Sequence, residues 1–233
     1  MREQFIYAVA RIRAKELSLL SAQDVSRLMS CETFEECINI LRDKGWGSET
    51  VDVADYQALL KIEEAKLWQL ISELVPDKSL FNVVLLPTDF HNLKAAVKGY
   101  ITESLSENLF IPGGNADISH LTRCIEERNF SDLPAYMAES AKLAFEKLLH
   151  TGDGQLCDNI IDKALLEAII GEGNRSKSAL IRDYAEFYVA SSNIKITVRS
   201  LILKKNMNFL NSILVKCDSI DVQKLAAATS GGI

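Results

Sequence analysis

The chain has 233 residues, of which 48% are hydrophobic and 25% are charged, and its net charge is −6. This balance is typical of a globular protein with one large domain or two smaller ones, and it excludes a disordered chain. The acidic surplus disfavours nucleic acid as a partner, because phosphate binding needs an excess of lysine and arginine on one face. With only 4 prolines and 11 glycines, the sequence favours long helices over a sheet with frequent turns.

Metal sites and membrane spans are not predicted. The five cysteines contain no C-x-x-C pair, and together with three histidines they lack the spacing of a zinc site. We expect no metal, no cofactor, and free cysteines that act as small buried hydrophobic residues in a reducing compartment. The N-terminus mixes charged with apolar residues at helical spacing, unlike a signal peptide. No apolar run approaches the roughly 20 residues of a membrane span, so we expect a water-soluble protein.

The N-terminal part begins with three predicted helices. Residues 3–20 carry an apolar stripe at helical spacing. A start signal at residues 21–24 opens a second, short helix. Thr33 and Glu36 form a capping-box pattern at the start of a third helix, which the G-W-G segment at residues 45–47 ends.

The clearest amphipathic helix of the sequence covers residues 56–74, where lysine and glutamate alternate with an apolar stripe. Residues 81–86 have β-like side chains but form too short a run, and we interpret them as a buried helical turn or linker. A further helix is predicted to begin at Pro87 with Thr88 or Asp89 as its cap. A loop follows it at residues 111–115. The remaining helices are predicted at residues 118–127, 134–149, 156–170, 178–205 and 208–214, with a short one after Asp218.

Two of these helices share the pattern N-[LI]-K-x-x-V-[KR], at residues 92–98 and 193–199, which are 101 positions apart. A looser copy opens the chain, where Arg11 and Lys15 keep the four-residue basic spacing and Val9 replaces the asparagine. A short helix and then another follow each copy. Repetition on this scale indicates stacked or ring-like helical subdomains.

The basic residues of the repeat can be interpreted either as the solvent-exposed edge of an amphipathic helix or as residues with a shared function. In a single copy, Lys94 and Lys98 are neighbours on one helix face and form a solvated edge. Three copies at similar places favour a shared role. They do not show what the basic edge contacts.

A nucleotide-binding loop is the enzymatic alternative. Residues 171–178 differ by one residue from G-x-x-x-x-G-K-[ST], in which Lys177 and Ser178 would contact phosphate and magnesium. Ser176 stands where that loop needs glycine, and the preceding residues have helical rather than strand spacing. We favour a helix that ends at one of the two glycines, followed by a new helix with a serine cap. A generic helical adaptor is the remaining alternative.

Four segments occur in the order of a known family: Tyr7–Arg13, the D-x-x-N-L-K helix from Asp89, the C-D-N-I-I-D-K helix from Cys157, and the S-N-I-K-x-x-x-R helix from Ser192. With these segments the sequence resembles the C subunit of the V/A-type rotary ATPases, which is related to the d subunit of the eukaryotic V-ATPase. The resemblance spans essentially the whole chain, which makes it more specific than any one of these segments.

The resemblance implies a funnel-like, all-α protein of three similar helical subdomains without an active site. Such proteins cap the cytoplasmic face of the membrane rotor ring, receive the foot of the central stalk, and transmit torque. The expected partners are therefore the central-stalk subunits and the rotor ring, and the expected location is the cytoplasmic face of the membrane, without a transmembrane span. The candidate contacts with the stalk or between subdomains are the repeat residues Arg11, Lys15, Asn92, Lys94, Lys98, Asn193, Lys195 and Arg199.

The repeat predicts a first unit at residues 1–86, a second at 87–185 and the start of a third at 186–233. Three complete units of about 80–100 residues would need roughly 300 residues. We therefore expect an incomplete third unit, with apolar interface exposed beside it.

Overall fold

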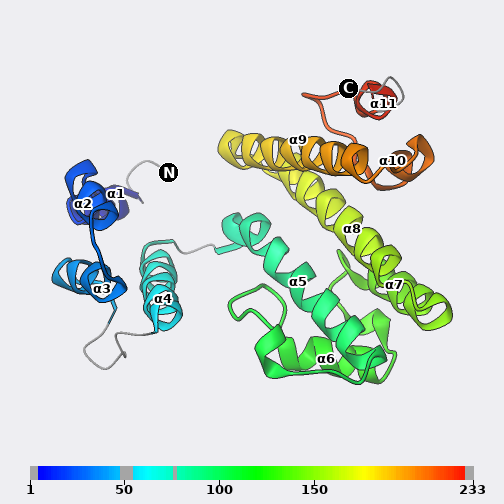
Figure 1. Cartoon of the computed structure of the whole chain (residues 1–233), viewed down its shortest axis with the longest axis horizontal. Helices are drawn as coiled ribbons and strands as arrows, with labels where there is room; N and C mark the ends of the chain where they lie inside the picture. The colour runs from blue at the N-terminus through cyan, green and yellow to red at the C-terminus, as the bar shows by residue number, and fades with distance from the viewer. Residues whose placement is uncertain (1–4, 48–54, 76–77, 229–233) are drawn as a thin grey trace. The chain divides into compact units, whose positions relative to one another are not determined.

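The computed structural model describes residues 5–47, 55–75 and 78–228, and this part of the chain is helical without any strand. The expected all-α fold is therefore confirmed. The chain divides into two compact units, Met1–Lys78 and Ser79–Ile233 (Figure 1). Among the described helices, none is both long enough and apolar enough to cross a membrane.

The described part of the first unit contains four α-helices, of which the last three have polar N-caps. The four helices are α1 (Ile6–Glu16), α2 (Ala22–Met29), α3 (Phe34–Asp43) and α4 (Tyr56–Leu74). Ser21 and Asp24 form the capping box of α2, and Thr33 accepts a hydrogen bond from the backbone N–H of Glu36 at the start of α3. Helix α1 is shorter than the predicted 3–20, and residues 3–4 lie outside the described part.

Asp24 joins the start of α2 to the end of α3. Its carboxylate accepts hydrogen bonds from the backbone N–H and the hydroxyl of Ser21, at 2.9 and 2.7 Å. The Lys44 ammonium lies 2.9 Å from the other carboxylate oxygen. The hydrogen bond from Lys44, followed by those from Ser21, holds the pKa of Asp24 well below its ordinary value. The carboxylate of Asp24 thus caps α2 and links its start to the end of α3.

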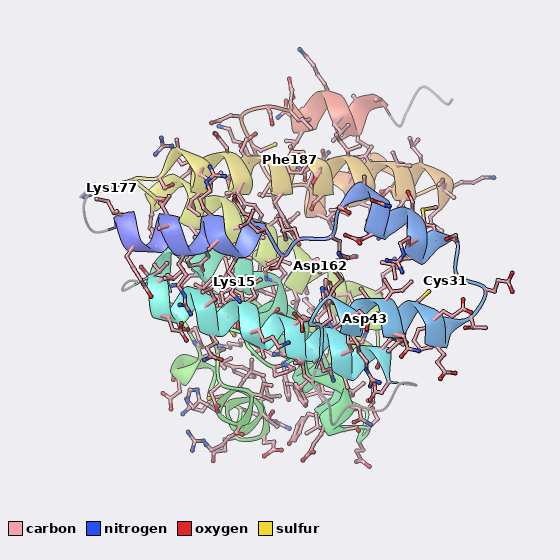
Figure 2. All side chains as sticks on the ribbon, turned by 90° about the vertical axis from the view of Figure 1, so that its left-hand side faces the viewer. Lys15, Cys31, Asp43, Asp162, Lys177 and Phe187 are labelled. Atoms are coloured by element: carbon pink, nitrogen blue, oxygen red, sulfur yellow. The ribbon has the colours of Figure 1, made fainter. Side chains whose placement is uncertain are left out.

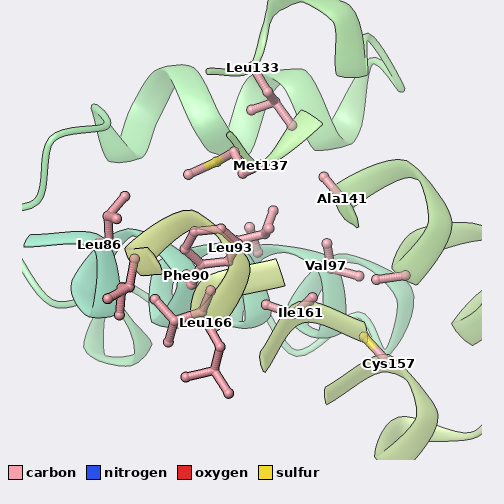
Figure 3. Packing of buried hydrophobic residues seen from close by; sticks show 14 of the residues in the cluster. Leu86, Phe90, Leu93, Val97, Leu133, Met137, Ala141, Cys157, Ile161 and Leu166 are labelled. Carbon is pink, nitrogen blue, oxygen red and sulfur yellow. The ribbon is translucent and has the colours of Figure 1, made fainter. Parts of the chain in front are cut away.

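A short 3-10 helix at Lys78–Phe81 spans the boundary between the units, and the second unit contains the larger core. Its α-helices are α5 (Asn82–Ile101), α6 (Ile118–Glu126), α7 (Ala138–Thr151), α8 (Gly154–Arg175), α9 (Ala179–Ile202), α10 (Met207–Ile213) and α11 (Val222–Ala227). Short 3-10 turns at Glu107–Leu109 and Phe130–Asp132 flank α6. Helix α5 packs against α6, α7 and α8, and α8 packs against α9. Figure 3 shows Phe90, Leu93 and Val97 of α5 in one cluster with Ile161 and Leu166 of α8.

Helix α5 begins five residues earlier than predicted, at Asn82, and Pro87 lies inside it. Residues 81–86 are therefore helical, which confirms the helical interpretation and excludes the linker, whereas the expected cap at Thr88 or Asp89 is wrong. Proline inside a helix removes one backbone hydrogen bond and costs about 3 kcal/mol. Val83 and Leu86 are buried on this early part of α5, and each such burial stabilises by about 1.5–3 kcal/mol. Packing thus outweighs the local signal of the proline.

Helix α8 continues through Gly171 and Gly173 to Arg175, so the predicted helix end at these glycines is wrong. A Cβ at Gly173 would overlap the Cβ of Ala185 on α9, so this glycine permits the close approach of α8 and α9. The phosphate-loop alternative is wrong for the same reason. A helix, instead of a strand and an open loop, precedes Lys177 and Ser178, and the backbone N–H groups that would cradle phosphate belong to that helix.

The predicted boundaries between units fall inside helices. The boundary between residues 86 and 87 lies within α5, and that between residues 185 and 186 lies within α9. The division of the chain into three repeated units stays a prediction.

The close approach of α8 and α9 can be tested with two glycines of one helix. Gly173→Ala is expected to destabilise the second unit by about 1–3 kcal/mol, because the added methyl group overlaps Ala185. Gly171→Ala is the matched control: only the end of the Arg175 side chain lies within 4 Å of its Cβ. It is expected to stabilise by about 0.5–1 kcal/mol through helix propensity. Urea unfolding measures the free energy of unfolding of both variants. Equal effects of the two substitutions would contradict a close approach of α8 and α9 at Gly173.

Candidate functional site

Asn92 of α5 binds the backbone of one residue in the segment that returns after this helix. Its amide nitrogen donates to the carbonyl oxygen of Ile111 at 2.8 Å, and its amide oxygen accepts from the Ile111 N–H at 2.8 Å. The Asn92 side chain is buried. A side-chain amide carries both a donor and an acceptor, so it can satisfy both backbone groups of one residue.

Asn193 of α9 makes the same pair of hydrogen bonds with Val215. The donated bond measures 2.7 Å and the accepted bond 3.1 Å, and Asn193 is also buried. We call this double hydrogen bond of a buried asparagine with one backbone residue the asparagine clamp. The residues just before Ile111 and Val215 have extended backbones in both cases. The N-caps of the following helices, Asp117 and Asp221, lie six positions after Ile111 and Val215.

The turns that leave the two helices also correspond. Glu103 after α5 and Lys204 after α9 both have φ of 52°, and these positions are again 101 residues apart. The next N–H donates to a carbonyl five residues earlier in each case, from Ser104 to Gly99 at 2.9 Å and from Lys205 to Ser200 at 2.8 Å. The register of α5 and α9 is thus fixed by backbone geometry as well as by side chains.

An acidic side chain on each long helix holds the end of the returning segment. The carboxylate of Asp89 is buried and accepts from the Asn115 amide, the Ala116 N–H and the Tyr136 hydroxyl at 2.8–3.0 Å. Burial, together with the Asp89 charge, raises the pKa of Tyr136, so its hydroxyl stays protonated and donates.

Glu186 of α9 accepts from the N–H of Ser219 at 2.6 Å and from its hydroxyl. Burial raises the pKa of Glu186, but the hydrogen bonds from Ser219, Asp218 and Cys217 together outweigh burial, so the pKa of this carboxyl is lowered. The carboxylate therefore remains a hydrogen-bond acceptor at neutral pH.

The two lysines of the second repeat copy pair with carboxylates on α8. The Lys94 ammonium lies 2.6 Å from Asp162, and that of Lys98 lies 2.9 Å from Asp158. The two lysines are four positions apart on α5, and the two aspartates are four positions apart on α8. These lysines therefore connect α5 to α8.

The equivalent cations on α9 have no such contact. Lys195 and Arg199 are exposed, and neither side chain has an ion pair or hydrogen bond to any described residue. Val198 and Ile194, beside them in the pattern, are about half exposed. The basic residues of α9 thus differ from those of α5, which pair with carboxylates of α8.

The first repeat copy keeps only part of this arrangement. Arg11 of α1 pairs with Glu73 of α4 at 3.3 Å. Lys15, on the same helix (Figure 2), is exposed and has no side-chain partner in the described part of the chain. Val9, which replaces the asparagine, is exposed. The first copy therefore has an ion pair between helices but no asparagine clamp.

The structure thus gives the eight candidate residues two kinds of environment. Asn92, Lys94, Lys98 and Asn193 join parts of the second unit, and Arg11 joins two helices of the first. Among the eight, Lys15, Lys195 and Arg199 are exposed and have no side-chain partner in the described part of the chain. Whether any of them contacts a stalk or another subdomain stays a prediction.

Sequence reasoning missed the acidic partners. Asp158 and Asp162 lie four positions apart on α8 and match the spacing of Lys94 and Lys98 on α5. This matched spacing was the available signal. Asp89 had been interpreted as a helix cap, whereas it holds the returning segment.

The thiols offer no reactive centre in the described part of the second unit. Cys124, Cys157 and Cys217 are buried and free, as expected. Burial raises the pKa of Cys157 to about 11 and also raises the pKa of the other two, so these thiols stay protonated and unreactive at neutral pH. Among the described residues, no group of three or more potential ligands has the geometry for a metal ion.

The asparagine clamp predicts a cost for truncation that a surface asparagine does not show. Asn92→Ala removes both hydrogen bonds to the backbone of Ile111, a residue that is 45% exposed, and is expected to destabilise by about 1–3 kcal/mol. Asn174→Ala, at an exposed helix position, is the control and is expected to change stability by less than about 0.5 kcal/mol. Urea unfolding gives the energies. Hydrogen exchange at Ile111 should lose protection, and retained protection would contradict the clamp.

The ion pairs between α5 and α8 predict a measurable coupling. Double-mutant cycles with Lys94→Ala and Asp162→Ala, and with Lys98→Ala and Asp158→Ala, should each give about 0.3–1 kcal/mol, because both pairs are partly exposed. Cross combinations of Lys94 with Asp158 serve as controls and should give less. A coupling that does not weaken at high salt would speak against an electrostatic origin.

Comparison with known proteins places this chain among subunits of rotary ATPases. Residues 8–232 match the family described as ATP synthase (C/AC39) subunit. The C subunit of the V-type sodium ATPase of Enterococcus hirae is 22% identical over 222 residues, which are 94% of this chain and 68% of that protein. The C subunit of the A-type ATP synthase of Methanothermobacter thermautotrophicus is 24% identical over 212 residues, 84% of this chain and 54% of the relative.

The C subunit of the A-type ATP synthase of Pyrococcus furiosus is 22% identical over 239 residues, 97% of this chain and 64% of that protein. The chain thus spans between about half and two thirds of the length of these curated relatives. The resemblance seen in the sequence is confirmed. Because the match covers nearly all of its length, the chain belongs to the ATP synthase (C/AC39) subunit family.

Proposed function

We propose that this chain is a non-catalytic central-rotor component of a V/A-type ATPase or ATP synthase, which couples the central stalk to the membrane rotor ring. The observation that carries the proposal is the family match over residues 8–232. The relatives named as C subunits of a V-type sodium ATPase and of A-type ATP synthases support it. In this role the chain serves ATP-linked proton or sodium transport without hydrolysing ATP itself.

The packing of the second unit supports a mechanical role. A part that transmits torque must resist relative movement of its helices. Helix α5 is held to α8 by a buried core and two ion pairs, and to its returning segment by the asparagine clamp. Close-packed interiors have low compressibility and transmit strain. These contacts therefore stiffen the unit.

The proposal assigns two roles to the repeated cations. The paired ones, Arg11, Lys94 and Lys98, brace helices within a unit. The exposed ones, such as Lys15, contact acidic groups of the partners. In the complete assembly the partners are the central-stalk subunits and the rotor ring. The chain then lies peripherally on the cytoplasmic face of the membrane, as one part of a funnel of helical units.

Reconstitution with purified partners tests this proposal. The chain is expected to co-elute with the central-stalk subunits or with the detergent-solubilised rotor ring of the same organism, and to hydrolyse no ATP alone. Lys15→Glu should weaken stalk binding at least threefold, because it places a negative charge on the basic edge of α1. Lys61→Glu on α4, also at an exposed position, is the matched control. Absence of association with both partners would overturn the proposal.

A further inference from the structure

Two cysteines of the first unit lie where α2 ends and α3 begins. Cys31, labelled in Figure 2, belongs to the turn between the two helices, and Cys37 lies near the start of α3. Both side chains are half-buried within the first unit, and both thiols are free. These two cysteines thus differ from the three buried cysteines of the second unit. We call Cys31 and Cys37 the α2–α3 dithiol.

The two thiols contact the same turn of α2 and each other. The Cys31 thiol donates to the carbonyl oxygen of Arg27 at 3.3 Å, and the Cys37 thiol donates to that of Leu28 at 3.6 Å. Arg27 and Leu28 are consecutive residues, so both sulfur atoms lie beside one helical turn. Burial, followed by a hydrogen bond with the Cys37 thiol, raises the pKa of Cys31. The fold therefore brings the two sulfur atoms into contact.

Contact between two thiols is the geometry from which a disulfide forms. The bond needs the two side chains to point at each other, with sulfur atoms about 2.05 Å apart. Thiols that already share a hydrogen bond reach this distance by rotation of their side chains. Cysteines of the second unit have other partners: Cys124 hydrogen-bonds with His120. Cys217 hydrogen-bonds with Asn193. The α2–α3 dithiol is thus arranged differently from these buried thiols.

The dithiol lies at the opposite end of the α2–α3 pair from its ion pair. Asp24 at the start of α2 and Lys44 at the end of α3 are joined by a 2.9 Å ion pair. The end of α2 and the start of α3 are joined only by the weaker contacts of the thiols. A surface depression of about 360 Å³ beside Cys31, lined also by Arg27, lets a small molecule approach. A disulfide here closes the second end of the helix pair covalently.

We propose that Cys31 and Cys37 are a redox-responsive pair, which a low-molecular-weight disulfide such as oxidised glutathione converts reversibly into an intramolecular disulfide between α2 and α3. The inference goes beyond rotor coupling, because it concerns the first unit and requires neither the stalk nor the ring.

The conversion is an exchange in two steps. One protein thiolate attacks a sulfur atom of the small disulfide, whose S–S bond breaks, and a small thiolate leaves. The second protein thiol loses its proton and attacks the protein sulfur of the mixed disulfide, which releases the second small thiolate. The small thiolates take up the two protons that the protein thiols lose. Two protein thiols are thus oxidised, one small disulfide is reduced to two thiols, and an excess of small thiol reverses both steps.

Oxidised glutathione is the probe, and it is added to the full native chain. The remaining thiols are then alkylated in denaturant and counted by mass spectrometry. Three of the five cysteines are expected to be alkylated, and dithiothreitol should restore alkylation of all five. Cleavage after Glu32 and Glu36 should give fragments joined by a Cys31–Cys37 bond. Five alkylated thiols, glutathione that stays on the protein, or a bond to any other cysteine would each overturn the proposal.

Single substitutions separate the pair from the other thiols. Cys31→Ser and Cys37→Ser should each prevent the intramolecular bond, so that reaction stops at a mixed disulfide with glutathione. Cys124→Ala, which removes a buried thiol of the second unit, is the control and should form the bond as the unaltered chain does. Circular dichroism checks that each variant keeps its helix content. An intramolecular disulfide that persists in Cys31→Ser would contradict the assignment of the pair.

A comparison with the unfolded chain separates the effect of the fold from that of closeness in sequence. The equilibrium constant for formation of the Cys31–Cys37 bond is measured in glutathione buffers, once in the native chain and once in concentrated urea. Because the fold holds the thiols in contact, the native constant should be larger by at least about tenfold. An equal or smaller native constant would mean that the fold does not favour the bond, and would overturn the proposal. Failure of rotor reconstitution leaves these outcomes unaffected, so the two proposals fail separately.

Discussion

The asparagine clamp is the interaction on which the second unit depends. After α5 and after α9 the chain turns through a residue with positive φ. It then forms a 3-10 helix after α5 or the short helix α10 after α9, and continues as an extended segment whose backbone has no neighbouring strand in the described part of the chain. Buried backbone groups without partners are costly. Asn92 and Asn193 satisfy both groups of one residue in that segment. This requirement explains why the repeat keeps an asparagine, since aspartate lacks the donor and leucine lacks both groups.

The clamp determines local structure around each long helix, but it does not determine how distant helices pack. It sets where the returning segment lies against its own long helix, and therefore where the cap of the following helix lies, six residues later at Asp117 or Asp221. It does not choose which helix packs on the opposite face. On α5 that choice is associated with the apolar cluster and with Lys94 and Lys98, whose acidic partners lie 68 and 60 residues away in sequence.

Local sequence patterns predicted most helices, because helix periodicity and capping depend on residues that are close together in the sequence. Periodicity located α4 and α9, and the polar caps at Ser21 and Thr33 located the starts of α2 and α3. The errors arose where a distant contact overrides a local preference. Gly173 resembles a helix end, yet it is needed for the approach of Ala185.

The sequence likewise predicted only part of the candidate site, namely its residues and not their contacts. The spacing of four residues identified the cations, but their roles depend on whether a carboxylate lies opposite. No local pattern distinguishes Lys94, which is paired, from Lys195, which has no partner among the described residues. Asp89 shows the same limit, because a buried acceptor for a loop and a helix cap look alike in sequence.

Comparison of the three copies shows that the clamp and the ion pairs are independent devices. The first copy has Val9 in place of the asparagine and still pairs Arg11 with Glu73. The third keeps Asn193 and its clamp without any described partner for Lys195. Only the second has both, and its helix has no exposed apolar side chain between Leu86 and Val97. The clamp therefore accompanies the turn in both copies that have the asparagine, whereas the ion pairs with α8 accompany the buried face of α5.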